Sequence, residues 1–189
     1  MKHSIVLTEN RDITSLQQPA IFLDRDGVVI KEKHYLSNPN NVELEQGIVD
    51  FLVSMKNCCY LIIIVTNQSA ISRGLLDWET YESVTNRMLS FFPSSNLVDA
   101  IYANGYIDNS NNDWRKPLPG MILQAAHEFN IDLKSSILIG DKVSDLIAGA
   151  RAGIKDLIHL RTGHGLAETA YINLDSHHRQ TPCKGTVSA

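Results

Sequence analysis

The sequence has only three cysteines among its 189 residues, and it has no apolar run near the roughly 18 residues that a membrane-spanning helix needs. Three cysteines cannot form a disulfide framework or a four-cysteine zinc site. Cys58 and Cys59 adjoin an apolar segment, where we expect them to be small buried hydrophobic residues, and Cys183 lies in a polar tail. The first twenty residues lack the basic and then long apolar pattern of a signal peptide. We therefore expect a cytoplasmic protein without a membrane partner.

Positive charge is also scarce, because 17 lysines and arginines face 21 aspartates and glutamates, for a net charge of −4. This balance argues against a nucleic-acid partner. A phosphate-bearing ligand would have to be held by a local group of side chains or by a metal ion. The composition, 43% hydrophobic and 20% charged, is typical of a globular protein. We expect a monomer whose single domain spans residues 1–189, with a core at about 19–175, a polar C-terminal tail and no inserted lid domain.

Short apolar segments alternate with segments of helical periodicity. Buried parallel strands, which lack polar alternation, are predicted at residues 21–23, 61–65, 100–102, 137–139 and 157–160. Apolar stripes of helical spacing occupy residues 48–55, 78–92, 121–129 and 143–150. Pro119 stands near the start of the third stripe, and Gly153 is the expected C-cap of the fourth. This alternation predicts a doubly wound α/β fold with a mainly parallel five-stranded sheet flanked by helices.

The first predicted strand ends abruptly at two carboxylates, in the stretch AIFLDRDGVV. Asp26 and Gly27 could simply form a turn, because Asp-Gly between apolar runs is a strong hairpin signal. In open parallel sheets, however, ligands bind outside the carboxyl ends of the strands, and other predicted strands also end in polar residues. Thr66 follows the second strand, Asp141 follows the fourth, and Lys116 precedes the third helix. These residues are therefore candidates for one shared site.

The chemistry of these residue types suggests phosphoryl transfer. Clustered carboxylates are unfavourable unless a cation or proton separates them, and an oxygen-only set with room for water and phosphate favours Mg²⁺. Asp24 and Asp26, two apart on an extended segment, can point to the same side. One would attack a phosphorus while the other exchanges a proton with the leaving oxygen. Thr66 and Lys116 would hold the phosphoryl oxygens.

Four motifs, FLDRDG, VTNQS, RKPLPGM and GDKVSD, stand in the order and approximate spacing of those of the haloacid dehalogenase superfamily phosphatases, which the chain resembles over residues 19–166. Within this superfamily it is similar to the group of D-glycero-D-manno-heptose 1,7-bisphosphate 7-phosphatases, with the histidinol-phosphate phosphatases as near relatives. The resemblance implies a Mg²⁺-dependent phosphoric monoester hydrolase without a cap domain, which acts on a small phosphorylated metabolite such as a sugar bisphosphate through an aspartyl-phosphate intermediate.

The resemblance also implies a role for individual residues. Asp24 matches the nucleophile, Asp26 the acid/base, and Asp141 a metal ligand beside Asp24 and the backbone carbonyl of Asp26. Thr66 and Lys116 match positions that stabilise the phosphoryl group, and Arg115 matches a recognition position that could contact a second phosphate. The residues expected to bind the substrate are Glu32, Lys33, His34, Tyr35, Asn67, Gln68, Ser69, Arg115 and Lys142.

The chain departs from the family in the stretch ANGYIDNSNNDW at residues 103–114, which lacks the cysteines and histidine of a common zinc-binding loop. No zinc is therefore expected, and Trp114 is expected to pack this loop instead. Four functions remain as alternatives: a histidinol-phosphate phosphatase, a nucleic-acid 3′-end phosphatase, a phosphotransferase and a catalytically silent binding domain.

Several polar residues have an ordinary structural interpretation. Asp145 is either part of the site or an acid that favours the dipole of its helix. Arg73 is interpreted as a loop charge outside the site, and residues 163–165 as a simple turn. His159, inside an apolar segment, is expected to be a hydrogen-bonded core histidine.

Overall fold

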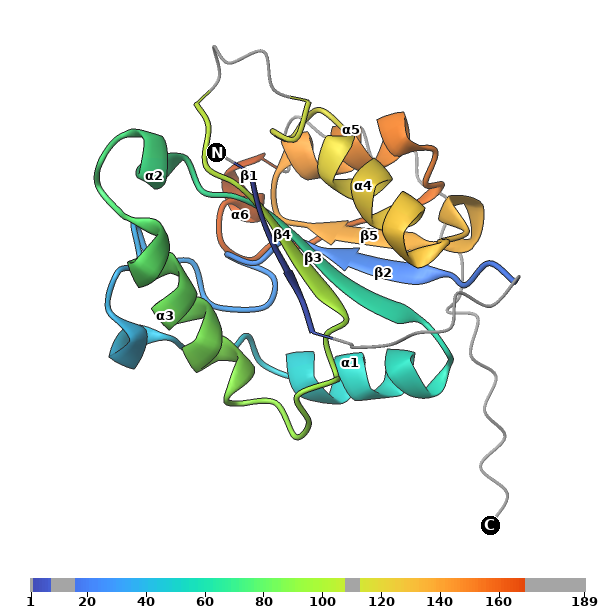
Figure 1. Ribbon diagram of the computed structural model, residues 1–189, viewed down its shortest axis with the longest axis horizontal. Coiled ribbons are helices and arrows are strands. Elements are labelled where there is room, and N and C mark those ends of the chain that lie inside the picture. Colours follow the sequence, from blue (N-terminus) through green and yellow to red (C-terminus); the bar gives the residue numbers. More distant parts are fainter. Residues whose placement is uncertain (1, 8–15, 108–112, 169–189) are drawn as a thin grey trace.

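The computed structural model describes residues 2–7, 16–107 and 113–168, and it contains a six-stranded sheet with the order β1-β4-β3-β2-β5-β6 (Figure 1). β1 pairs antiparallel with β4, and every other neighbouring pair is parallel. The strands are β1 (Lys2–Val6), β2 (Ala20–Leu23), β3 (Leu61–Asn67), β4 (Ala100–Asn104), β5 (Ile137–Gly140) and β6 (Asp156–His159).

The helices connect these strands in the predicted alternation. They are α1 (Ile48–Asn57), α2 (Ser69–Ser72), α3 (Trp78–Leu89), α4 (Gly120–Phe129), α5 (Val143–Ala152) and α6 (Gly165–Glu168), with 3₁₀ turns η1 (Pro39–Asn41) and η2 (Leu133–Ser135). Gly153 caps α5 with a φ of +94°, as predicted. No helix in the described part of the chain is long and apolar enough to span a membrane.

Helices cover both faces of the sheet, and successive strand residues point to opposite faces. In β2, Ile21 and Leu23 pack with residues of α1 and α3, whereas Ala20 and Phe22 pack with residues of α4 and α5. Figure 1 shows these two pairs of helices on opposite sides of the sheet. The prediction of a doubly wound α/β fold is therefore confirmed.

Two predictions about the sheet and its surroundings are wrong. The sheet has a sixth strand, β1, which the sequence does not reveal because KHSIV is an edge strand with alternating exposure rather than a buried apolar run. Cys58 is half-buried and Cys59 is exposed, since both lie in the turn that follows α1 and not in the core. Cys183 and the predicted C-terminal tail lie outside the described residues.

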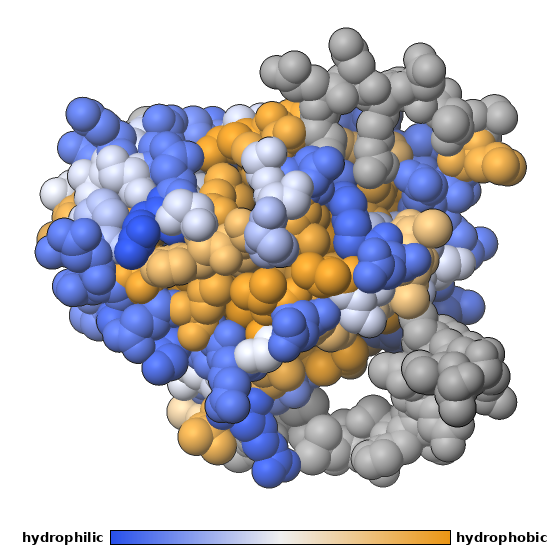
Figure 2. Space-filling view, turned by 90° about the horizontal axis from the view of Figure 1, so that it is seen from below, coloured by the Kyte–Doolittle hydropathy of each residue, from blue (hydrophilic) through white to orange (hydrophobic). Residues whose placement is uncertain are grey.

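One face of the molecule is apolar at its centre. Figure 2, seen from below relative to Figure 1, shows apolar side chains gathered in the middle of the face where α1 lies, with hydrophilic side chains around them. The carboxyl ends of the parallel strands lie elsewhere, beside α2 and α6 (Figure 1).

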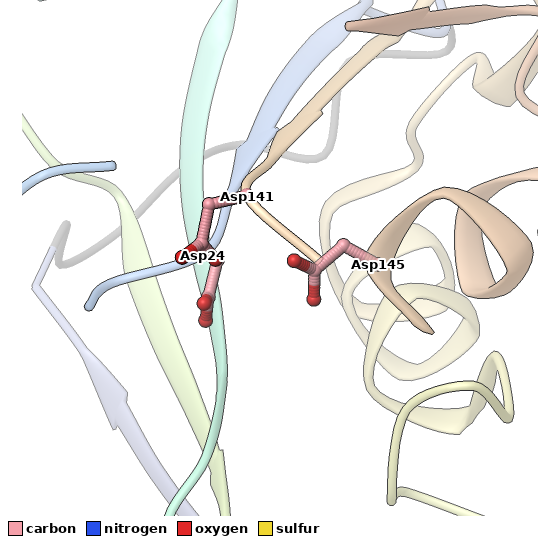
Figure 3. Close-up of side chains that lie close together, drawn as sticks. All are labelled: Asp24, Asp141 and Asp145. Atoms are coloured by element: carbon pink, nitrogen blue, oxygen red, sulfur yellow. The ribbon is translucent and has the colours of Figure 1, made fainter. Parts of the chain in front are cut away.

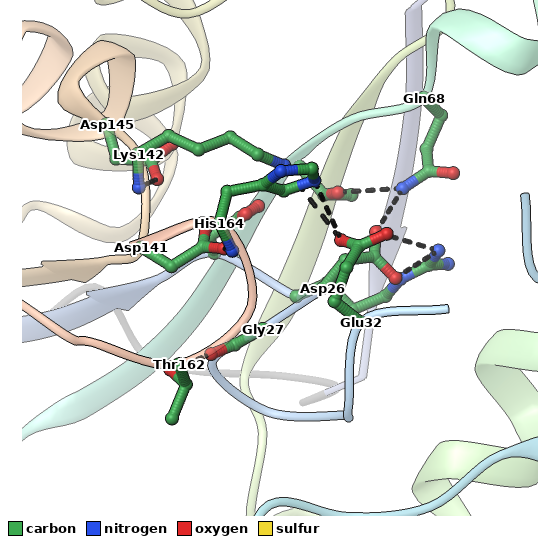
Figure 4. A network of polar contacts seen from close by, with 12 residues as sticks. Asp26, Gly27, Glu32, Gln68, Asp141, Lys142, Asp145, Thr162 and His164 are labelled. Atoms are coloured by element: carbon green, nitrogen blue, oxygen red, sulfur yellow. Dashed lines mark hydrogen bonds and ion pairs between the residues drawn. The ribbon is translucent and has the colours of Figure 1, made fainter. Parts of the chain in front are cut away.

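At this carboxyl edge, the loops after β2 and β6 approach each other so closely that only glycine fits. Gly27 has a φ of +87° and Gly163 a φ of +50°, and a Cβ on either would lie 2.5 Å or less from Oδ2 of Asp141. The hydroxyl of Thr162 donates to the carbonyl of Gly27, which links the two loops (Figure 4). Residues 163–165 are thus more than the simple turn predicted, because they wrap around a buried carboxylate.

We expect Gly163→Ala to destabilise the protein more than Gly74→Ala, measured by urea unfolding. Gly74 also has a positive φ, +68°, but a Cβ there would meet nothing within 4 Å. Gly74→Ala should therefore cost only backbone strain, about 1 kcal/mol, whereas Gly163→Ala adds overpacking of about 1–3 kcal/mol. Equal losses would contradict the close approach of the two loops.

Candidate active site

Three buried aspartates meet at the carboxyl edge of the sheet (Figure 3). Asp24 follows β2, Asp141 follows β5, and Asp145 lies in the first turn of α5. Each offers one carboxylate oxygen, these oxygens all lie within 4.8 Å of one another, and no residue of the three is more than 4% exposed. An all-carboxylate set of this kind is suited to a hard divalent cation.

Lys116 is the buried cation that holds two of these acids. Its Nζ lies 2.8 Å from Oδ1 of Asp24 and 2.7 Å from Oδ1 of Asp145, and it donates to the carbonyl of Val65 at 2.8 Å. Burial alone would lower the pKa of Lys116, but the charges of Asp145 and Asp24 outweigh it, so that the pKa is raised. The lysine is therefore held firmly in its charged form.

Asp141 shows that the cluster has too little positive charge, although Lys142 offsets part of the repulsion. Its Oδ2 accepts the backbone N–H of His164 at 2.8 Å, but its Oδ1 is buried and has no hydrogen-bond partner among the described residues. Burial and the charge of Asp24 raise the pKa of Asp141 to about 7. A divalent cation would satisfy the unpaired oxygen and remove the repulsion, so the residues present fit a magnesium ion.

Asp26 is held by donors from two elements, apart from the three clustered aspartates. The Nη2 of Arg25 lies 3.0 Å from both carboxylate oxygens of Asp26, and the Nε2 of Gln68 donates to Oδ2 at 2.8 Å (Figure 4). Arg25 is itself 2% exposed and lies over the ring of Tyr81, 5.1 Å from its centroid. These contacts orient the Asp26 carboxylate.

Sequence reasoning did not single out Arg25. The only signal for its role is its position between two aspartates at the end of a buried strand, where a fully buried charge needs a partner. Burial lowers the pKa of Arg25, but the charge of Asp26 outweighs this effect and the pKa is raised.

A cavity of about 230 Å³ opens beside Asp26. Eight of the nine predicted substrate-binding residues line it, and the exception is Arg115, whose Nη1 donates to the carbonyl of Tyr106 at 3.0 Å. The lining residues that were predicted are Glu32, Lys33, His34, Tyr35, Asn67, Gln68, Ser69 and Lys142. The structure therefore brings together the loops after β2, β3 and β5 around one space.

Several side chains near the cavity also position the catalytic candidates. The amide of Asn67 bonds the backbone of Lys116 in both directions, donating to its carbonyl at 3.0 Å and accepting its N–H at 3.1 Å. Gln68 donates to the hydroxyl of the buried Thr66 at 2.9 Å. Asp145 is both part of the site and an acid at the start of its helix. Its Oδ1 pairs with Lys116, and its Oδ2 accepts the backbone N–H of Lys142 at 3.0 Å.

Two other predictions about the surroundings of the site are confirmed. His159 is partly buried, and its Nε2 lies 3.0 Å from the carbonyl of Asp141. Trp114 is buried and packs edge-on against Tyr102, with 5.7 Å between the ring centroids. The indole therefore fixes the loop just before Arg115 and Lys116.

Comparison with known proteins agrees with this site. Residues 20–167 match the family described as polynucleotide kinase 3 phosphatase. A D-glycero-alpha-D-manno-heptose-1,7-bisphosphate 7-phosphatase of Photorhabdus laumondii is 39% identical over 78% of this chain and 85% of its own length. A D-glycero-beta-D-manno-heptose-1,7-bisphosphate 7-phosphatase of Helicobacter pylori is 39% identical over 72% of this chain and 80% of its own.

Solved structures agree with the fold. The crystal structure of D,D-heptose 1,7-bisphosphate phosphatase from B. bronchiseptica, complexed with magnesium and phosphate, superimposes with a TM-score of 0.74 at 30% identity, covering 82% of this chain and 87% of that one. A had-like phosphatase from Mesorhizobium loti gives the same TM-score at 29% identity, covering 82% of this chain and 78% of that one.

The fold and the buried aspartates define a phosphatase of the haloacid dehalogenase type. The chain belongs to the family within this class that includes the heptose 1,7-bisphosphate 7-phosphatases. The resemblance read from the four motifs is thereby confirmed.

We expect Asp141→Asn to raise the melting temperature of the metal-free protein at pH 8. The pKa of Asp141 rises on folding from 3.8 to about 7, so its contribution to stability is present below pH 4 and lost as the pH rises through 7. An uncharged amide of the same shape removes this loss. Calorimetry in the presence of a chelator measures this difference in melting temperature, and it is then repeated with Mg²⁺.

In the same experiment, Mg²⁺ should raise the melting temperature of the wild type and should have little effect on Asp141→Asn. Asp50→Asn, on the first turn of α1 and away from the site, is the control. A wild type insensitive to Mg²⁺, or a variant that responds equally, would show that Asp141 does not hold the ion.

Proposed function

We propose that this protein is a Mg²⁺-dependent phosphatase that removes the 7-phosphate from a D-glycero-D-manno-heptose 1,7-bisphosphate and releases heptose 1-phosphate. The observation that carries the proposal is the buried group of Asp24, Lys116 and Asp141 beside the cavity that contains Asp26. Relatives named for this reaction support it, and those named for the α and β anomers match this chain at the same 39% identity.

In the first step, an oxygen of Asp24 attacks the phosphorus, and the bond between phosphorus and the sugar oxygen breaks. Lys116 and the hydroxyl of Thr66 hold the phosphoryl oxygens, where the buried ammonium stabilises negative charge without reorganisation. The proton that the leaving sugar oxygen needs comes from Asp26. A bound magnesium would add positive charge beside Asp24 and Asp141, offsetting the repulsion between the carboxylates and the phosphate.

In the second step, water attacks the aspartyl-phosphate on Asp24 and restores the free carboxylate. Asp26 accepts the proton of this water, and its contacts with Arg25 and Gln68 hold its carboxylate in place for this task. The residues that line the cavity would bind the sugar. Glu32, whose pKa is raised by burial and by the charge of Asp26, lies among them and can bond sugar hydroxyls.

The cavity and the charge balance also support a small substrate. A cavity of about 230 Å³ suits a phosphorylated sugar, and a net charge of −4 gives no general attraction for a polynucleotide. We infer that the chain acts as a cytoplasmic monomer with one domain and no cap.

We expect Asp26→Asn to slow the cleavage of alkyl phosphates far more than the cleavage of activated aryl phosphates. The loss for a sugar phosphate should be about 10²–10⁴-fold, because an alkoxide needs a proton to leave, whereas p-nitrophenolate does not. Single-turnover release of the leaving group measures this step without the later hydrolysis. Asp24→Asn, the matched control, should abolish release from both, and an equal loss for both substrates in Asp26→Asn would contradict the role of Asp26.

We expect kcat/KM for the heptose bisphosphate to exceed that for histidinol phosphate and for a 3′-phosphorylated oligonucleotide by about 100-fold or more, which corresponds to two well-made contacts. Initial rates of phosphate release with Mg²⁺ present and then chelated provide the test. Preference for histidinol phosphate or for the oligonucleotide would replace the proposed substrate, and no Mg²⁺-dependent release from any ester would indicate a silent domain.

A further inference from the structure

The cavity beside Asp26 is lined by four lysine and arginine side chains, and three of them face a carboxylate. Arg25 pairs with Asp26, Lys33 lies 2.6 Å from Glu43, and the Nζ of Lys142 lies 4.0 Å from Glu32. The fourth is Arg73. Its Nη1 donates to the hydroxyl of Tyr35 at 3.0 Å, and within the described part of the chain it makes no ion pair.

Arg73 is placed on the wall of the cavity by the same short segment that carries other lining residues. It follows α2 directly, and its backbone N–H donates to the carbonyl of Ser69. Tyr35 comes from a different loop, after β2, and has a φ of +51°. The bond between Arg73 and Tyr35 therefore joins two loops that line the cavity, and both residues are more than a third exposed.

The proposed substrate carries two phosphates, and each needs a positive partner. Lys116 already contacts Asp24 and Asp145 in the buried cluster, where the hydrolysed phosphate would bind. Arg115, the residue that the family resemblance suggested for a second phosphate, does not line the cavity and bonds the carbonyl of Tyr106. Arg73 is thus the lining cation whose charge no carboxylate of the described residues offsets.

We propose that Arg73, together with the hydroxyl of Tyr35, binds the phosphate of the substrate that is not hydrolysed. A guanidinium is suited to this task because its planar N–H groups can bind two phosphate oxygens at once. The inference rests on the proposed function, because only a bisphosphorylated substrate carries a phosphate that is not hydrolysed.

The test compares Arg73→Ala with the wild type on a heptose 1,7-bisphosphate and on the matching heptose 7-phosphate. The ratio of kcat/KM for the bisphosphate to kcat/KM for the monophosphate should fall about ten- to a hundredfold, mainly through a higher KM for the bisphosphate. Arg73→Lys should retain part of the ratio, since it keeps the charge and loses the planar fork. Tyr35→Phe, which removes one hydroxyl, should cause a smaller fall.

Arg87→Ala is the matched control, because Arg87 lies on α3 over the ring of Phe91 and does not line the cavity. It should leave the ratio unchanged. If Arg73→Ala lowers kcat/KM equally for both substrates, Arg73 supports only the loop and the inference is wrong. If the wild type prefers the bisphosphate and Arg73→Ala keeps that preference, the inference about Arg73 is wrong but the proposed function stands. If the wild type shows no preference, the proposed function fails with it.

Discussion

The site depends on the burial of one lysine among three aspartates. Lys116 is 3% exposed and contacts Asp24 and Asp145, while Asp141 keeps an unpaired oxygen and a raised pKa. Removing charges from water is costly, and an incomplete set of partners makes it more so. The fold bears this cost at one place, and the same excess of negative charge that destabilises the cluster attracts a divalent cation. The affinity for the ion and the repulsion between the carboxylates thus have a common origin.

The positions of the catalytic candidates follow from the sheet rather than from local sequence. β2, β3 and β5 are neighbours, so the polar residues after them meet although more than 100 residues separate Asp24 from Asp141. Asn67, at the end of β3, also positions a residue outside the sheet, because its side-chain amide bonds the backbone of Lys116 on a loop. The rigid strands therefore determine the geometry of groups on loops, which would otherwise be the least constrained part of the protein.

Much of this arrangement could be predicted from the sequence, because buried parallel strands leave a strong apolar signal and their ends are marked by polar residues. The strand β1 could not, since its alternating exposure resembles many surface segments. The different roles of Arg115 and Arg73 could not be predicted from the sequence either. Only the position of the cavity, which Arg73 lines and Arg115 does not, distinguishes the two arginines. Similarly, Gly163 shows its importance only when Asp141 is seen beside it.

The edge strand β1 has an effect well beyond the sheet. Its Lys2 pairs with Asp113 at 2.8 Å and lies over the ring of Trp114, 5.1 Å from the centroid, so that it secures the segment leading to Lys116. The stretch at residues 103–114 contains no sulfur or imidazole ligand. The pairing of Lys2 with Asp113 and the packing of Trp114 therefore hold the described end of this stretch, residues 113 and 114, so that an edge strand far from the aspartates helps to place the lysine between them.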